Sequence, residues 1–237
     1  MSDTLYLSLW YPNLRLEALP DKLTAVLGAF AAHGGEEKVY AATVWPVNWS
    51  EAPVFQRVYG RMGAAPGSIP GVEPRLAVAE ALELLHDDYA YEFQMGWNLW
   101  EWEEGNAGPS IARAAQSAPR FAQDDNPDLS APDERVLGRW ARGPRLVRVT
   151  GYGPLFDEGA YEQDGHIRID FGTDTPFLEE DADLDRVGAR HVEENVRQLV
   201  ELVGGVEKAS GATARLLWSE LGESLAQRLV ERLGMRN

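Results

Sequence analysis

Tryptophans and carboxylates that could recognise a sugar-like substrate lie together in YEFQMGWNLWEWEEG, at residues 91–105. Tryptophan rings can stack on a sugar, and two carboxylates can act as acid and base on its glycosidic bond. Such a pair can be assembled from Glu92, Glu101, Glu103 and Asp170. With 38 acidic residues in the chain, however, pairs of this kind arise anywhere, so the pattern has little specificity.

Other catalytic signatures are absent from the sequence. It contains no glycine-rich phosphate loop, no G-x-G-x-x-G, no G-x-S-x-G and no H-E-x-x-H. The segment HVEEN lacks the second histidine that would complete a zinc-protease helix. The four histidines are dispersed, and each is interpreted as a surface or helix-end residue rather than a general base: His33, His86, His166 and His191. We therefore expect neither a metal nor a cofactor.

Two acidic segments resemble ligand loops only in part. Residues 181–185, DADLD, have the spacing of the first calcium ligands, but Arg186 and Val192 occupy the positions of the required glycine and glutamate. An acidic loop before a helix accounts for the same residues. Residues 124–134, DDNPDLSAPDE, are interpreted as a turn-rich loop.

Composition narrows the classes of partner. The net charge of −16 argues against nucleic acid and anionic membranes, because phosphate contacts need clustered basic residues. It favours a basic protein partner or plain solubility. The absence of cysteine excludes disulfides and thiolate chemistry. No signal peptide or membrane-spanning run is found, so we expect a cytoplasmic protein.

The first part of the sequence predicts alternating strands and helices. Residues 4–11 favour a strand that is buried on both faces. Apolar residues spaced by three and four then mark a helix, which Gly34 and Gly35 end: Leu23, Val26, Leu27 and Phe30. Residues 38–45 predict a strand, and residues 52–63 and 75–85 predict helices.

Residues 89–99 alternate with period two, which is typical of a strand with one buried face. One parity is aromatic or apolar: Tyr89, Tyr91, Phe93, Met95, Trp97 and Leu99. Glu92 and Asn98 fall on the opposite parity. The pattern then slips by one residue, which puts Trp100 and Trp102 on the polar parity. Either a β-bulge returns both rings to the core, or they stand on the open face as a ligand or partner surface.

Residues 105–145 are rich in turn-forming residues and are interpreted as a linker or a functional loop. A strand at 145–152 and a hairpin at 161–172, turning at Asp164-Gly165, are expected to follow. Apolar residues then predict a helix: Val192, Val196, Leu199, Val200 and Val203. Gly204-Gly205 is expected to cap it, before a weak strand from residue 208 and a final helix.

The two ends of the chain resemble each other. Residues 34–63 align with residues 204–234, and the expected elements follow in the same order. The shared positions include Glu37-Lys38 with Glu207-Lys208, Ala42-Thr43 with Ala212-Thr213, Trp49-Ser50-Glu51 with Trp218-Ser219-Glu220, and Gln56-Arg57 with Gln227-Arg228. The alternative is a coincidence between two segments of similar composition.

This alignment predicts an α+β fold made of two ferredoxin-like β-α-β-α halves, with mixed or antiparallel sheets covered by helices. The halves would span residues 1–104 and 146–237 around the 105–145 linker, or form one compact domain. The cleft between them is the expected ligand site. Symmetry-paired candidates would lie near it, with the alternative, favoured because large aromatic residues dominate cores, that both tryptophans are core anchors: Trp49, Trp218, Arg57 and Arg228.

Three hypotheses of function follow. The first is a non-catalytic protein that binds a small ligand or a basic partner, for example an acidic inhibitor or immunity-type protein. The second is a carboxylate-dependent hydrolase with an aromatic-lined groove. The third is a structural role in a homo-oligomer. The ligand or partner candidates of the first are Trp100, Trp102, Glu92, Asn98, Trp49, Trp218, Arg57 and Arg228.

Overall fold

The structure, a computed structural model, describes residues 3–63, 71–103, 139–178 and 186–220. The chain divides into two compact units. The first consists of Met1–Trp100 and Arg142–Asn237, and the second of Glu101–Ala141. The second unit falls almost entirely within the segment that the sequence predicts to be a linker. Residues 104–138 of that segment lie outside the described residues.

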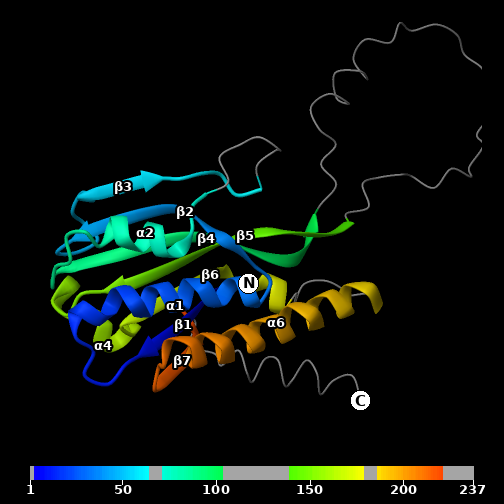
Figure 1. Cartoon of the computed structure of the whole chain (residues 1–237). Helices are drawn as coiled ribbons and strands as arrows, with labels where there is room; N and C mark the ends of the chain where they lie inside the picture. Colours follow the sequence, from blue (N-terminus) through cyan, green and yellow to red (C-terminus); the bar gives the residue numbers. More distant parts are fainter. Residues whose placement is uncertain (1–2, 64–70, 104–138, 179–185, 221–237) are drawn as a thin grey trace, which may run out of the picture. The chain divides into compact units, whose positions relative to one another are not determined.

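One seven-stranded antiparallel sheet forms the centre of the first unit (Figure 1). The strands follow the order β3-β2-β4-β5-β6-β1-β7. Their bounds are β1 Thr4–Trp10, β2 Gly35–Pro46, β3 Phe55–Val58, β4 Tyr89–Glu103, β5 Arg139–Tyr152, β6 Ile167–Thr173 and β7 Ala214–Ser219. The fold is therefore α+β, as the sequence predicts, but both predicted halves contribute strands to the same sheet.

Helices α1, α2 and α6 lie on the same face of this sheet (Figure 1). The longer helices are α1 Leu19–Ala32, α2 Pro74–Ala81 and α6 Arg186–Ser210. The shorter ones are η1 Leu16–Ala18, η2 Phe156–Glu158, α4 Tyr161–Asp164 and α5 Thr175–Leu178. No helix among the described residues is long and apolar enough to cross a membrane.

The hydrophobic core lies between the sheet and these helices. Strand β4 turns its odd-numbered side chains inward, and Tyr91, Phe93, Met95, Trp97 and Leu99 are fully buried. Helix α1 meets them with Leu23, Val26, Leu27 and Phe30, which are also fully buried. The Trp97 ring contacts aromatic rings from α1, β6 and α5, and its indole N–H donates to the His33 carbonyl at 2.9 Å. Both amphipathic patterns seen in the sequence are confirmed.

Two predicted elements are wrong in type. Residues 55–58 form strand β3, which pairs with β2, where a helix is predicted. The segment before Gly165 is the short helix α4 rather than the first strand of a hairpin. The second strand of that hairpin is confirmed as β6, with Ile167, Ile169 and Phe171 fully buried.

The predicted cap at Gly204-Gly205 is also wrong, because α6 continues through both glycines to Ser210. The continued helix also bears on the alignment of residues 34–63 with residues 204–234, because it changes the type of element at the aligned positions. Lys38 lies in strand β2 whereas Lys208 lies in helix α6, and Trp49 lies in a turn whereas Trp218 lies in β7. Aligned residues thus occupy different kinds of element, and neither the repeat nor the ferredoxin-like halves are confirmed.

Candidate functional site

Three chain segments meet at one end of the sheet. Antiparallel pairing places Leu9 of β1 and Gly151 of β5 on either side of Ile167 at the start of β6. The residues that immediately follow β1 and precede β6, Tyr11 and His166, therefore lie close together, next to Tyr152 at the end of β5. The Tyr152 backbone N–H donates to the His166 carbonyl at 3.0 Å, which fixes the end of β5 next to the start of β6.

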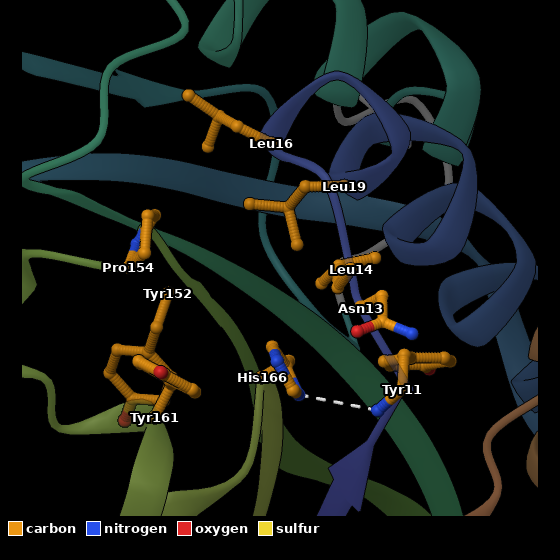
Figure 2. A pocket seen from close by; sticks show the side chains of 9 residues that line it. All are labelled: Tyr11, Asn13, Leu14, Leu16, Leu19, Tyr152, Pro154, Tyr161 and His166. Carbon is orange, nitrogen blue, oxygen red and sulfur yellow. Dashed lines mark hydrogen bonds between the residues drawn. The ribbon is translucent and has the colours of Figure 1, made fainter.

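A pocket of about 350 Å³ opens at this end of the sheet (Figure 2). We call it the His166 pocket, and its lining residues are Tyr11, Asn13, Leu14, Leu16, Leu19, Tyr152, Pro154, Tyr161 and His166. In Figure 2, His166 lies between Tyr11 on one side and the rings of Tyr152 and Tyr161 on the other. Aromatic and apolar walls with a few polar groups are typical of small-molecule sites.

His166 is held in one orientation and one tautomer. Its Nδ1 accepts a hydrogen bond from the Tyr11 backbone N–H, with a distance of 3.2 Å between the nitrogens. In the neutral ring the proton therefore lies on Nε2. Burial lowers the pKa of His166 below its ordinary value of 6.5, so the neutral ring predominates at pH 7. The Tyr161 ring packs against it at 4.9 Å between centroids.

Tyr152 forms a second fixed wall. Its hydroxyl donates to Asp164 Oδ2 at 3.3 Å, and Asp164 in turn pairs with Arg168. The Arg168 guanidinium also lies over the rings of Tyr6 and Tyr152, at 5.4 and 5.7 Å from their centroids. Burial is the main cause that raises the pKa of Tyr152 far above its ordinary value. The phenol therefore stays protonated and keeps donating to Asp164.

One lining residue of the pocket, Asn13, has a left-handed backbone conformation. Among the described residues, the non-glycine positions with positive φ are Asn13, Val47, Asp157 and Glu158, at 50°, 58°, 47° and 57°. Asn13 lines the pocket, and the Asp157 N–H donates to the Val47 carbonyl at 2.7 Å. Such conformations cost about 1–3 kcal/mol each and cluster at ligand sites. At the pocket itself this concerns Asn13 alone, and asparagine adopts the left-handed region more readily than most residues.

Two of the predicted site residues act on Tyr152. The Trp49 ring, 37% exposed, meets the Tyr152 ring edge-on at 6.2 Å between centroids and the Phe156 ring at 5.0 Å. The charge of Glu92, which is half-buried on β4, helps to raise the pKa of Tyr152. Neither side chain is part of the pocket lining.

Trp218 lies farther along the sheet, on strand β7. Its ring stacks on Tyr6 at 4.6 Å between centroids, and its indole N–H donates to Ser8 Oγ at 2.9 Å. Tyr6 is the residue over which Arg168 also lies. Trp218 is therefore connected to the Tyr152 wall only through other side chains.

Trp100 is held against helix α6 instead of the pocket. Asn195 accepts from the Trp100 backbone N–H at 2.9 Å and donates to its carbonyl at 2.8 Å. The indole N–H donates to Glu194 at 3.1 Å, and the ring stacks on His191 at 3.9 Å between centroids. The carbonyl of Asn98 accepts from Gln198 at 3.1 Å. This part of β4 is thus fixed by polar side chains of α6.

The remaining candidates are dispersed. Trp102 belongs to the second unit, is 45% exposed and contacts Trp140 edge-on, which agrees with the alternative in which its ring stays outside the core. Arg57 is exposed and pairs with Glu80 at 3.0 Å. Arg228 lies outside the described residues, as do the acidic segments 124–134 and 181–185. No group of three or more potential metal ligands occurs in the described part of the chain.

Sequence reasoning missed most of the His166 pocket. Tyr11 and Tyr152 look like the ends of buried strands, and His166 looks like a dispersed histidine. A signal was present in Gly165, which precedes His166 at the expected turn and adopts a φ of 85°. That signal locates a bend in the chain, but not the partners that the bend brings together.

Comparisons with known proteins give no relative for this chain: no family model, no curated protein and no solved structure matches it.

Proposed function

We propose that this protein binds a small ligand in the His166 pocket and does not convert it chemically. The observation that carries the proposal is the pocket itself, in which aromatic, apolar and polar side chains from three separate segments converge. The fixed tautomer of His166 supports it further. Preorganised polar groups lower the entropy that a ligand must overcome on binding.

The pocket favours this proposal over the hydrolase. A carboxylate-dependent hydrolase needs two acidic side chains that face one site. The lining residues include neither aspartate nor glutamate. Asp164, the acidic residue nearest along the chain to His166, accepts a hydrogen bond from the Tyr152 hydroxyl and pairs with Arg168.

The pocket also favours a small ligand over a protein partner. A stable protein interface buries roughly 800 Å² on each partner, whereas about 350 Å³ holds a molecule of small-ligand size. The acidic-inhibitor form of the binding proposal therefore needs a different surface. Its support is the net charge of −16, which identifies no particular patch.

A library of fluorinated fragments tests the proposal. Binding is measured by 19F NMR to the wild type, to Leu16→Trp, whose indole fills the pocket, and to Leu84→Trp, the same change at a leucine that is 76% exposed outside the pocket. We expect fragments that bind the wild type and Leu84→Trp but not Leu16→Trp. Absence of any binding fragment, or binding that survives Leu16→Trp, would overturn the proposal.

A further inference from the structure

The His166 pocket has a lining without ionised side chains. Its nine residues are three tyrosines, three leucines, one asparagine, one proline and one histidine. Burial raises the pKa of Tyr11 to about 12, and burial also keeps Tyr152 protonated. His166 is neutral at pH 7 because burial lowers its pKa. A charged ligand entering this space would lose its hydration without gaining a counter-ion from the lining.

Two cations contact the rings of lining tyrosines, and both already have hydrogen-bond or ion-pair partners. Arg168, on β6, pairs with Asp164. Lys22 donates to the Ser210 carbonyl at 2.7 Å. Both contact a lining tyrosine through the face of its ring, so their charges already have acceptors close by. Neither residue is among those that line the pocket.

The polar groups that remain are suited to an uncharged ligand. Nδ1 of His166 is occupied by the Tyr11 N–H, which leaves the Nε2–H as a hydrogen-bond donor. Asn13 is an exposed residue of the lining. Its side-chain amide offers both a hydrogen-bond donor and an acceptor. Around these groups, tyrosine rings and leucine side chains provide surfaces for a flat apolar body.

We propose that the ligand of the His166 pocket is an uncharged molecule with a planar ring and a hydrogen-bond acceptor that meets the Nε2–H of His166. This inference rests on the proposed binding function and specifies its ligand class. The physical reason is the desolvation penalty: burying an unpaired ion is far less favourable than burying a neutral polar group that finds one hydrogen bond.

Three probes of nearly the same shape separate charge from shape. Benzamide is neutral, benzoate is an anion and benzamidinium is a cation, and each is titrated into the full-length protein at about pH 7.5 by calorimetry. We expect benzamide to bind at least roughly tenfold more tightly than either ion. If either ion binds as tightly as benzamide or more tightly, the proposed ligand class is wrong while the binding function stands.

A second measurement identifies the hydrogen bond without any substitution. The side-chain 15N signal of Nε2 in His166 should shift on addition of benzamide, whereas that of His191, on α6 and stacked on Trp100, should not.

A substitution tests the same hydrogen bond. His166→Phe should weaken the binding of benzamide roughly tenfold, and His191→Phe is the matched control. An unchanged Nε2 signal in a benzamide-bound protein would overturn the assigned donor. Failure of all three probes, together with failure of the fragment library, would overturn the binding function itself.

Discussion

Replacing Gly165 with alanine should destabilise the protein strongly. Gly165 adopts φ 85° and ψ 159°, a region that is essentially restricted to glycine. A Cβ at this position would lie 2.7 Å from the Leu9 nitrogen and 2.9 Å from the Leu9 oxygen. Both neighbours are backbone atoms of β1, so they cannot move aside without disturbing the pairing of Leu9 with Ile167.

The expected magnitude follows from two contributions. The backbone conformation costs alanine about 1–3 kcal/mol, and disturbing a ladder hydrogen bond between β1 and β6 adds about 1 kcal/mol. We therefore expect a loss of about 2–4 kcal/mol in the free energy of unfolding. Urea unfolding followed by tryptophan fluorescence measures it, provided that the m-value stays constant.

Gly28→Ala is the matched control for Gly165→Ala. Gly28 lies in α1 with open space around a built Cβ, so the same substitution there should stabilise the protein by up to about 1 kcal/mol. A Gly165→Ala protein within about 0.5 kcal/mol of the wild type would refute the described turn, and with it the placement of His166.

The other predictions concern stability. Asn195→Leu should cost about 2–4 kcal/mol and speed amide exchange at Trp100, because three hydrogen bonds from a fully buried side chain are lost; unchanged exchange would contradict this. Gly204→Ala should stabilise the protein by up to about 1 kcal/mol, because Gly204 lies inside α6 with open space around a built Cβ. Gly205→Ala is the contrasting variant, because a Cβ there would collide with the His33 ring. A destabilised Gly204→Ala protein would instead indicate that the helix ends at this glycine pair. Because the pKa of His166 is lowered on folding, the unfolded chain binds more protons, so stability should fall as pH drops below 6.5 toward the folded pKa. Unfolding at several pH values should show this slope in the wild type and a smaller one in His166→Phe.

Local patterns could be predicted because they depend on near neighbours in the sequence. The alternation from Tyr91 to Leu99 and the spacing of Leu23, Val26 and Phe30 record which side of an element is buried. Residues 54–58 were a harder case, since Val54, Phe55 and Val58 are spaced as on a helix face. Pairing with β2 makes the segment a strand, and such pairing is not visible locally.

The pocket could not be predicted for the same reason. Tyr11, Tyr152 and His166 are far apart in sequence, and only the order of β5, β6 and β1 in the sheet brings them together. Gly204 shows the converse error. A glycine pair looks like a helix cap from its neighbours, yet tertiary packing keeps α6 helical to Ser210.

Chemical-shift mapping of the 15N-labelled full-length protein with benzamide tests the central claim most directly. The account predicts that the largest changes occur at backbone amides around the His166 pocket, at residues 11, 13, 152, 161 and 166. No changes at high benzamide concentration would contradict the proposed ligand class, and changes centred instead on Trp102 or on Trp218 would contradict the claim that this pocket is the ligand site.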